Sequence, residues 1–434
     1  MLITSTPLAP IVRALRTNQL DLLAYINELC DRIEAVDPVI HAFLPETGRR
    51  ERLLAEAGAL QARFPDPARR PPLYGVPVGV KDVFAVDGFP TQAGSRLPSE
   101  LFAGPEADCV TLLRQAGALI VGKTITTEFA FFEPGPTRNP HNLDHTPGGS
   151  SSGSAAAVAS GLCLLALGTQ TTGSTMRPAA FCGIVGFKPT YGRIPRDGLI
   201  LSSPSLDTVG FFTQDSAGVA LVAPVLCQNW QNEEMQAHSL PVLGVPDGPY
   251  LEQAETEALA VFERQLARLE AAGYTVRRVS AMQDIAAIIE RHNLLVAAEM
   301  ARGHADWFAR YEQLYRPLTA GAIRKGQHIS EEERATYRAG RAALRSQLAA
   351  VTTEAGIDLW VCPAAPGPAP AGLTTTGNSN MNVPWTHAGM PAITLPTARA
   401  VNGLPLGLQL VGAPMADEKL VACAEQIAQV LAQS

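Results

Sequence analysis

Lys81 lies in an apolar segment, YGVPVGVKDVF, where the nearest charged residue along the chain is Asp82. A lysine that acts as a general base must be neutral near pH 7, so its pKa must fall from about 10.4 to roughly 7–8. Burial produces such a shift, because a low-dielectric environment disfavours the ammonium form. The segment predicts a desolvated base; the alternative is a lysine that pairs with Asp82 or extends to solvent from a strand end.

A second candidate is the polar, glycine-containing stretch GTQTTGST at residues 168–175, which lies between an apolar strand and the apolar segment MRPAAFCGIVGFKP. Loops normally lie at the surface, since their backbone groups need hydrogen-bond partners. A polar loop inside core-like sequence therefore indicates a lined cavity. Successive backbone N–H groups in such a turn can bind an anion, as an oxyanion hole must.

The serine-rich loop HTPGGSSSGS at residues 145–154 has several interpretations. A serine at 150–154 is expected to cap the alanine-rich helix that follows. A phosphate-binding loop is disfavoured, because no lysine follows the last glycine and no GxGxxG pattern is present. Residues 149–153 satisfy GxSxG, which would make Ser151 a nucleophile, but an α/β-hydrolase elbow follows a strand and RNPHNLDHTP does not have a strand pattern.

Three segments taken together resemble the amidase signature family: GVPVGVKD around Lys81, GGSSSGSAAAVASG at 148–161, and GTQTTGSTMRPAAFCGIVGFKPTYGRIP at 168–195. The similarity extends over nearly the whole chain, through RIEAVDP, GPTRNPHN and GMPAITLP. The resemblance implies a Ser-cisSer-Lys triad with Ser174 as nucleophile, Ser150 as the bridging serine and Lys81 as base. The spacings of 69 residues (81 to 150) and 24 residues (150 to 174) fit the family pattern.

The same resemblance implies a mechanism without a metal or an organic cofactor. Neutral Lys81 would take a proton from Ser150, which would take one from Ser174 as its Oγ attacks an amide carbonyl. A serine can relay a proton because it is both donor and acceptor. The implied oxyanion donors are the backbone N–H groups of Thr171, Thr172, Gly173 and Ser174.

The sequence departs from the family pattern GTDTGGS around the nucleophile. Gln170 stands where an aspartate is common, Thr172 replaces a glycine, and Arg177 follows Ser174 by three residues instead of two. Thr172 is β-branched and has less backbone freedom than glycine, which affects how its N–H is directed. Arg177 is interpreted either as a structural clamp or as a group that binds a substrate carboxylate.

Other residues are candidates for a substrate pocket. Phe129 and Phe131 in TTEFAFFEPG resemble the family segment near the substrate entrance, and they suggest a pocket for apolar or aryl groups, with core packing as the alternative. Trp385 and His387 in NVPWTHAGMP are candidates for lining the acyl pocket, with a packed structural histidine as the alternative. No His/Cys cluster has zinc-ligand spacing, so no metal site is expected.

The elements that must position these residues follow an α/β rhythm. A first helix is expected with a cap at Thr17 or Asn18 and an end at Asp37-Pro38. A strand ending at Lys81, a helix at 107–115 and a strand at 118–121 form a βαβ pattern, and a further strand is expected at 162–167. Later come strands near 240–248 and 274–279, a helix at 252–272 with Gly273 after its end, and a helical region with a Ser330/Glu333 capping box.

The resemblance implies an α/β amidase signature fold, a mixed central sheet covered by α-helices on both faces. We expect one domain over residues 1–434, with a signature core at about 74–200 and a variable helical region at about 283–350.

Composition excludes several classes of protein. The chain has 434 residues, is 46% hydrophobic and 17% charged, and carries a formal net charge of −7. The apolar content argues against disorder, and the lack of clustered cations argues against nucleic acid as a partner. The longest apolar stretch is shorter than the roughly 20 residues that a membrane span needs. No signal-peptide pattern is seen, and seven scattered cysteines without a CxxC pair indicate reduced thiols in a cytoplasmic protein.

The expected function is hydrolysis of a small-molecule carboxamide or a related C–N bond, such as a urea or carbamate. One alternative is a glutaminase subunit of a tRNA-dependent amidotransferase, and another is a catalytic subunit that needs a small accessory protein. A non-catalytic binding module is disfavoured, because Lys81, Ser150 and Ser174 are all present. The family resemblance also suggests a homodimer.

Overall fold

The computed structural model describes residues 1–235 and 239–432. In this part of the chain, ten strands form one mixed sheet in the order β2-β1-β3-β5-β4-β9-β10-β8-β6-β7. The strands are β1 Pro77–Lys81, β2 Leu119–Thr124, β3 Leu165–Gln170, β4 Val185–Lys188, β5 Thr208–Thr213, β6 Leu243–Asp247, β7 Val276–Ser280, β8 Leu359–Pro363, β9 Ala392–Arg399 and β10 Pro405–Val411. Strand β1 is parallel to β2 and β3, β6 is parallel to β7 and β8, and the other pairs are antiparallel. Strands from both halves of the chain therefore share one sheet.

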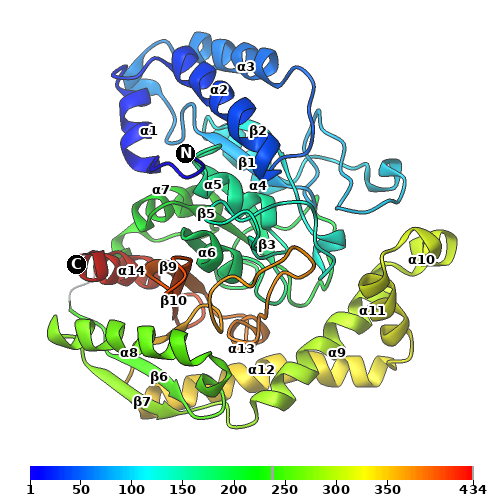
Figure 1. Ribbon diagram of the computed structural model, residues 1–434, viewed down its shortest axis with the longest axis vertical. Coiled ribbons are helices and arrows are strands. Elements are labelled where there is room, and N and C mark those ends of the chain that lie inside the picture. Colours follow the sequence, from blue (N-terminus) through cyan, green and yellow to red (C-terminus); the bar gives the residue numbers. More distant parts are fainter. Residues whose placement is uncertain (236–238, 433–434) are drawn as a thin grey trace.

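Helices cover both faces of this sheet (Figure 1). The α-helices of the described residues are α1 Leu8–Arg16, α2 Leu22–Ile40, α3 Arg49–Arg63, α4 Asp108–Gln115, α5 Ser152–Ala159, α6 Met176–Cys182, α7 Ser216–Leu226, α8 Thr256–Ala271, α9 Ile285–Gly303, α10 Ala305–Tyr311, α11 Pro317–Gln327, α12 Glu331–Glu354, α13 Val383–His387 and α14 Asp417–Ala432.

Alternate residues of strand β3 show how the two faces are filled. Leu165 and Leu167 join a buried cluster that includes apolar side chains of α4, α7 and α14. Ala166 points the other way, as successive strand residues do, and joins a cluster with side chains of α2 and α5. The predicted fold class, a mixed sheet covered by helices on both faces, is confirmed.

The predicted βαβ unit is present and places Lys81. Strand β1 is buried over its whole length and ends at Lys81, and helix α4 connects it to the parallel strand β2. Strand β3 lies on the other side of β1. Since β1 is flanked by strands on both edges and covered on both faces, its last residue is held in the interior.

The region predicted to be helical contains α9 to α12. Helix α9 packs against α11 and α12, and together with α10 they extend away from the sheet at one side of the molecule (Figure 1). The predicted capping box is confirmed: the Ser330 hydroxyl accepts from the Glu333 N–H, and the Glu333 carboxylate accepts from the Ser330 N–H. Helix α8 is followed by Gly273 with a φ of +94°, also as predicted.

The first helix differs from its prediction at both ends. Thr17 closes a separate short helix, α1, while α2 is capped by Asp21, whose carboxylate accepts from the Ala24 N–H at 2.8 Å. Helix α2 also passes through Pro38 and ends at Ile40. Beyond the proline, Asp37 accepts hydrogen bonds from the N–H groups of Ala42 and Phe43, which fixes the exit of the chain.

The polar loops differ from their predictions in detail. A serine, Ser151, is the N-cap residue of α5, as predicted, but its side chain makes no capping hydrogen bond. Ser152 donates to the Gly148 carbonyl, and Ser154 donates to the Leu167 carbonyl. These hydroxyls attach the loop to neighbouring backbone instead. The predicted strand at 162–167 lies three residues later, so residues 168–170 belong to β3, where they pair with β5.

All seven cysteines are free and buried. Within the described ranges, no helix is both long enough and apolar enough to cross a membrane.

Candidate active site

Lys81 and Ser150 are in direct contact in the interior of the protein. The Lys81 Nζ donates to the Ser150 Oγ at 2.7 Å and to the Thr169 Oγ1 at 2.6 Å. Lys81 is fully buried, and Ser150 is 1% exposed. Ser150 follows a cis peptide bond from Gly149. The end of β1, the loop before α5 and strand β3 thus converge on one amine.

Asp82, the neighbour of Lys81 in sequence, does not neutralise it. Its carboxylate forms a buried ion pair with Lys123 of β2 at 2.8 Å and accepts from the Gln92 N–H. Adjacent residues near a strand end point to opposite sides, so the carboxylate and the Lys81 amine are separated. The alternative in which Asp82 pairs with Lys81 is therefore not what the structure adopts.

Burial lowers the pKa of Lys81 to about 7, an effect that the charge of Asp207 partly opposes. Asp207 is itself buried, which raises its pKa to about 6, and it accepts from the Thr171 hydroxyl and the Ser203 N–H. Burial also lowers the pKa of Lys188 to about 7, but that amine donates to two backbone carbonyls. Of these two buried lysines, Lys81 is the one that contacts a serine hydroxyl.

Ser174 ends a turn, residues 171–174, that begins directly after strand β3. The Thr386 hydroxyl donates to the Thr172 carbonyl at 2.7 Å, and the Thr172 hydroxyl lies 3.3 Å from the His292 Nε2. Among the hydrogen bonds of the described residues, none is donated by the backbone N–H of Thr172, Gly173 or Ser174. The Gly173 carbonyl accepts from the Arg177 N–H at 3.0 Å. The turn is thus fixed by its side chains and two carbonyls, while these three N–H groups are left for another acceptor.

Gly173 is required by the packing around this turn. A Cβ atom at this position would lie 2.4 Å from the Asn382 Oδ1 and 2.9 Å from the Ser379 Cβ. Both distances are shorter than van der Waals contact, so a larger residue would displace the turn.

Gln170, at the position where the family pattern has an aspartate, caps helix α6. Its Oε1 accepts from the N–H groups of Thr175 and Met176 at 2.8 and 2.9 Å, and its Nε2 donates to the Thr386 Oγ1. These bonds connect the end of β3, the start of α6 and helix α13. The neutral amide therefore holds both sides of the 171–174 turn.

Arg177 lies behind the site. It is 1% exposed, and its Nη2 donates to the Gly149 carbonyl at 2.6 Å and to the Thr376 hydroxyl at 3.1 Å. Burial lowers its pKa to about 9. Its contact with the carbonyl next to Ser150 matches the clamp interpretation, and it is absent from the lining of the cavity described next.

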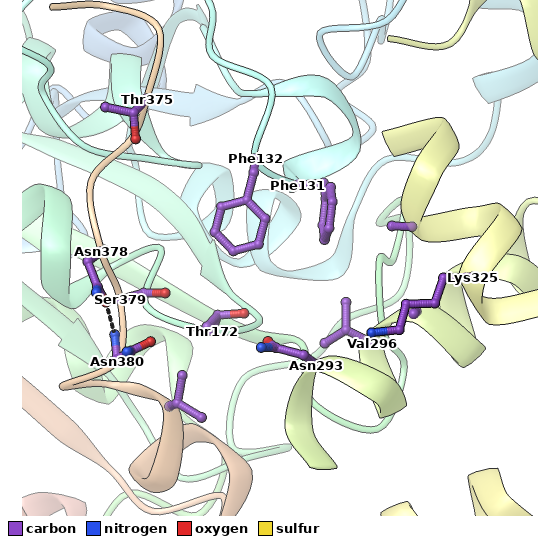
Figure 2. A pocket seen from close by; sticks show the side chains of 13 residues that line it. Phe131, Phe132, Thr172, Asn293, Val296, Lys325, Thr375, Asn378, Ser379 and Asn380 are labelled. Atoms are coloured by element: carbon purple, nitrogen blue, oxygen red, sulfur yellow. Dashed lines mark hydrogen bonds between the residues drawn. The ribbon is translucent and has the colours of Figure 1, made fainter. Parts of the chain in front are cut away.

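A cavity of about 550 Å³ lies against the 171–174 turn (Figure 2). Thr172 and Ser379 form part of its wall, and Phe131 and Phe132 form another part. Its 13 lining residues come from the turn, the segment after β2, helices α9, α11 and α13, and the loop after β8: Phe131, Phe132, Thr172, Asn293, Val296, Ala297, Ala322, Lys325, Thr375, Asn378, Ser379, Asn380 and Val383.

The other pocket candidates lie elsewhere. Phe129 is buried in an aromatic cluster with His304 and Tyr315 at centroid distances of 4.5 and 5.4 Å. The Trp385 Nε1 donates to the Tyr250 hydroxyl at 2.8 Å within the core. His387 is buried against His292 with ring centroids 5.5 Å apart. None of Phe129, Trp385 and His387 is in the lining of the cavity.

Several residues that hold the site could not be identified from the sequence: Thr169, His292, Thr386 and Asn382. Thr386, for example, is 214 positions from the Thr172 carbonyl that it contacts. Only the polar character of the 168–175 stretch pointed toward Thr169. Across the described residues, no group of three or more His, Cys, Asp and Glu side chains is arranged to hold a metal ion.

Comparison with known proteins gives consistent matches over most of the chain. The Amidase family model matches residues 24–421. A glutamyl-tRNA(Gln) amidotransferase subunit from Synechococcus sp. (strain WH7803) is 33% identical over 92% of this chain and 91% of its own. The protein of the same name from Trichlorobacter lovleyi is 31% identical over 94% of both chains.

Solved structures also match this chain over nearly its whole length. One described as "Crystal structure of amidase" has a TM-score of 0.86 and 33% identity, and covers 98% of this chain and 99% of its own. A peptide amidase, solved in complex with chymostatin, has a TM-score of 0.82 and 26% identity over 98% of this chain and 97% of its own. These matches define the class of the protein as an amidase-type hydrolase. More particularly, the chain belongs to the amidase signature family.

Proposed function

We propose that the protein hydrolyses carboxamides through an acyl-serine intermediate, with Ser174 as nucleophile, Ser150 as proton relay and Lys81 as base. The observation that carries this proposal is the 2.7 Å contact between the Lys81 Nζ and the Ser150 Oγ in a fully buried setting. With the pKa of Lys81 lowered to about 7, a large fraction of the amine is neutral at pH 7 and has a free lone pair.

The proton moves in two transfers. Neutral Lys81 accepts the proton of the Ser150 hydroxyl, and Ser150 accepts the proton of Ser174 as the Ser174 Oγ bonds to the amide carbon. The C–N bond then breaks, and the leaving nitrogen takes the proton back from Lys81 through Ser150. Water attacks the acyl-serine in the same manner and releases the carboxylic acid. Because both transfers use neutral hydroxyl groups, the relay requires no buried carboxylate.

The tetrahedral intermediate carries a negative charge on the former carbonyl oxygen. The N–H groups of Thr172, Gly173 and Ser174 have no acceptor within the described protein, which supports a role as donors to this oxygen. One such donor is typically worth about 10²–10³ in rate. In this proposal, Thr171 contributes through its hydroxyl contact to Asp207, which fixes the start of the turn, as well as through its N–H.

The cavity beside Thr172 is where the acyl group would lie. Its volume of about 550 Å³ lies in the range of small-molecule sites. Phe131 and Phe132 supply apolar surface, and Ser379 and Asn378 supply hydrogen-bonding groups. This combination fits a small amide, and the same chemistry would apply to a urea or a carbamate.

A second candidate is the glutaminase subunit of a tRNA-dependent amidotransferase. It is supported by the relatives named as glutamyl-tRNA(Gln) amidotransferase subunits, which match over more than nine-tenths of the chain. An accessory partner chain is proposed with it, since a subunit is one part of a larger enzyme. Ammonia release from glutamine, measured with the chain alone and with candidate partner chains, distinguishes the two functions.

The test of the first candidate is ammonia release from a panel of carboxamides by the wild type and four variants. We expect Ser174→Ala, Ser150→Ala and Lys81→Met each to lower kcat by at least about 10³-fold. Ser151→Ala is the matched control in the same loop, and it should retain activity. Full activity in Ser174→Ala would refute the proposal.

A further inference from the structure

The lining of the cavity beside Thr172 has an uneven charge. Of its 13 residues, Lys325 of helix α11 is the one with a formal charge, and the set includes no aspartate or glutamate. The remaining polar residues are neutral amides and hydroxyls, such as Asn293, Asn378 and Thr375. A ligand in this cavity therefore meets a net positive charge.

Lys325 is available to a ligand. Its side chain makes no ion pair among the described residues. Its neighbour Arg324, in contrast, is paired with Glu312 through two contacts of 2.9 and 2.6 Å. Figure 2 shows Lys325 extending from its helix toward the cavity, with Asn293 and Thr172 between it and Ser379. The ammonium group thus lies across the cavity from the 171–174 turn.

We propose that the substrate is an amide that carries a carboxylate at the end remote from the scissile bond, and that Lys325 recognises this carboxylate. The inference rests on the proposed function, because it assumes that the reacting amide lies at the turn. With the amide carbon at the turn, a short acyl chain or ring would run between Phe131 and Asn293 and bring its far end to Lys325. Monoamides of dicarboxylic acids have this arrangement of charge.

The same lining disfavours a substrate with an ammonium group. A cation placed in the cavity would meet Lys325 and would find no carboxylate in the wall to balance it. Glutamine carries an ammonium group beside its carboxylate, whereas glutaramate, the monoamide of glutaric acid, has the same chain without the ammonium. The structure thus favours glutaramate-like amides over glutamine.

Equilibrium binding to the Ser174→Ala variant tests this inference without requiring turnover. The probes are glutaramate, its neutral diamide glutaramide, and glutamine, and the measurement is isothermal titration calorimetry. We expect glutaramate to bind roughly two- to fivefold more tightly than glutaramide, as an ion pair at an exposed site allows, and more tightly than glutamine. Because the binding affinities are measured without catalysis, they can be interpreted even if the proposed hydrolysis of carboxamides is refuted.

Two substitutions assign the effect to Lys325. Lys325→Gln in the Ser174→Ala background should remove the preference for glutaramate over glutaramide. Arg324→Gln, which alters the adjacent exposed cation outside the cavity lining, should keep that preference. Any of four results would overturn the inference. These are equal affinities for glutaramate and glutaramide, no detectable binding of glutaramate, tighter binding of glutamine than of glutaramate, and a preference for glutaramate that survives Lys325→Gln.

Discussion

The Nζ of Lys81 lies 2.6 Å from the Oγ1 of Thr169, so the amine has a second hydroxyl partner besides Ser150. Thr169 is on strand β3, next to the strand that ends at Lys81. The two contacts direct the amine, and the neutral form can keep donating to Thr169 while its lone pair faces Ser150.

Replacing this partner should change both the rate and its pH dependence. In Thr169→Val the ammonium form loses an acceptor inside a desolvated site, so the pKa of Lys81 should fall further below about 7. We expect kcat to drop roughly tenfold, because the amine is no longer directed at Ser150. Thr169→Ser should restore both properties. A Thr169→Val enzyme with the wild-type rate and pH profile would show that this contact is incidental.

The wild-type enzyme should gain activity as the pH rises through about 7. Below that pH Lys81 is an ammonium ion without a lone pair, and above it the amine is neutral and can accept the Ser150 proton. The profile of kcat/KM should therefore fall about tenfold per pH unit on the acid side and level off on the alkaline side. A profile that is flat from pH 5 to 8 would contradict the assignment of Lys81 as base.

Replacing Asp207 tests whether Lys81 is the group whose titration sets the midpoint of the pH–rate profile. Its negative charge raises the pKa of Lys81, so Asp207→Asn should move the midpoint of the profile to lower pH. Lys188, whose pKa is also about 7, contacts two backbone carbonyls and lacks an Asp207 contribution. An unmoved midpoint in Asp207→Asn would point to a group other than Lys81.

Gly173→Ala should abolish most activity while leaving the fold intact. The added Cβ would lie 2.4 Å from the Asn382 Oδ1, so the turn must shift and its N–H groups must move away from the oxyanion. We expect a loss of about 10²–10³-fold in kcat, the value of one oxyanion donor. Gly58→Ala is the control, since a Cβ there meets nothing within 4 Å on helix α3. The thermal midpoint of both variants checks that folding is retained.

His292 is expected to position the turn through Thr172. Its Nε2 lies 3.3 Å from the Thr172 hydroxyl, and burial holds its pKa well below the ordinary value, so the ring stays neutral. His292→Ala should lower kcat about tenfold with little change in KM, because the contact orients the turn without touching a ligand in the cavity. Retention of wild-type kcat, or a defect confined to KM, would assign His292 to packing alone.

Positions that depend on a local pattern could be predicted from the sequence. Lys81 ends a strand because an alternating, valine-rich segment precedes it, and the Ser330/Glu333 box and Gly273 follow local rules of helix ends. Prediction was incomplete where a hydroxyl had a choice of partner. Ser151 is the N-cap residue of α5 as expected, but its side chain does not cap the helix, and the Ser152 and Ser154 hydroxyls donate to the carbonyls of Gly148 and Leu167. Pairing of Asp82 with Lys123 likewise depends on the neighbouring strand.

The walls of the cavity were hardest to predict. The lining combines residues from helices α9 and α11 with the loop after β8. The contact between Gln170 and Thr386, which holds the adjoining turn, joins residues 216 positions apart. Such contacts come from tertiary packing, and no local pattern contains them. For this reason Phe131, a cavity residue, and Phe129, a core residue, looked equivalent in the sequence.

The central claim, that Ser174 is the nucleophile activated through Ser150 and Lys81, is tested most directly by trapping the serine. The enzyme is treated with a fluorophosphonate at pH 8, digested, and the modified peptide is identified by mass spectrometry. The account predicts an adduct on Ser174 that disappears in Ser174→Ala, forms much more slowly in Lys81→Met, and persists in Ser151→Ala. An adduct on Ser151, or labelling that survives in Ser174→Ala, would contradict it.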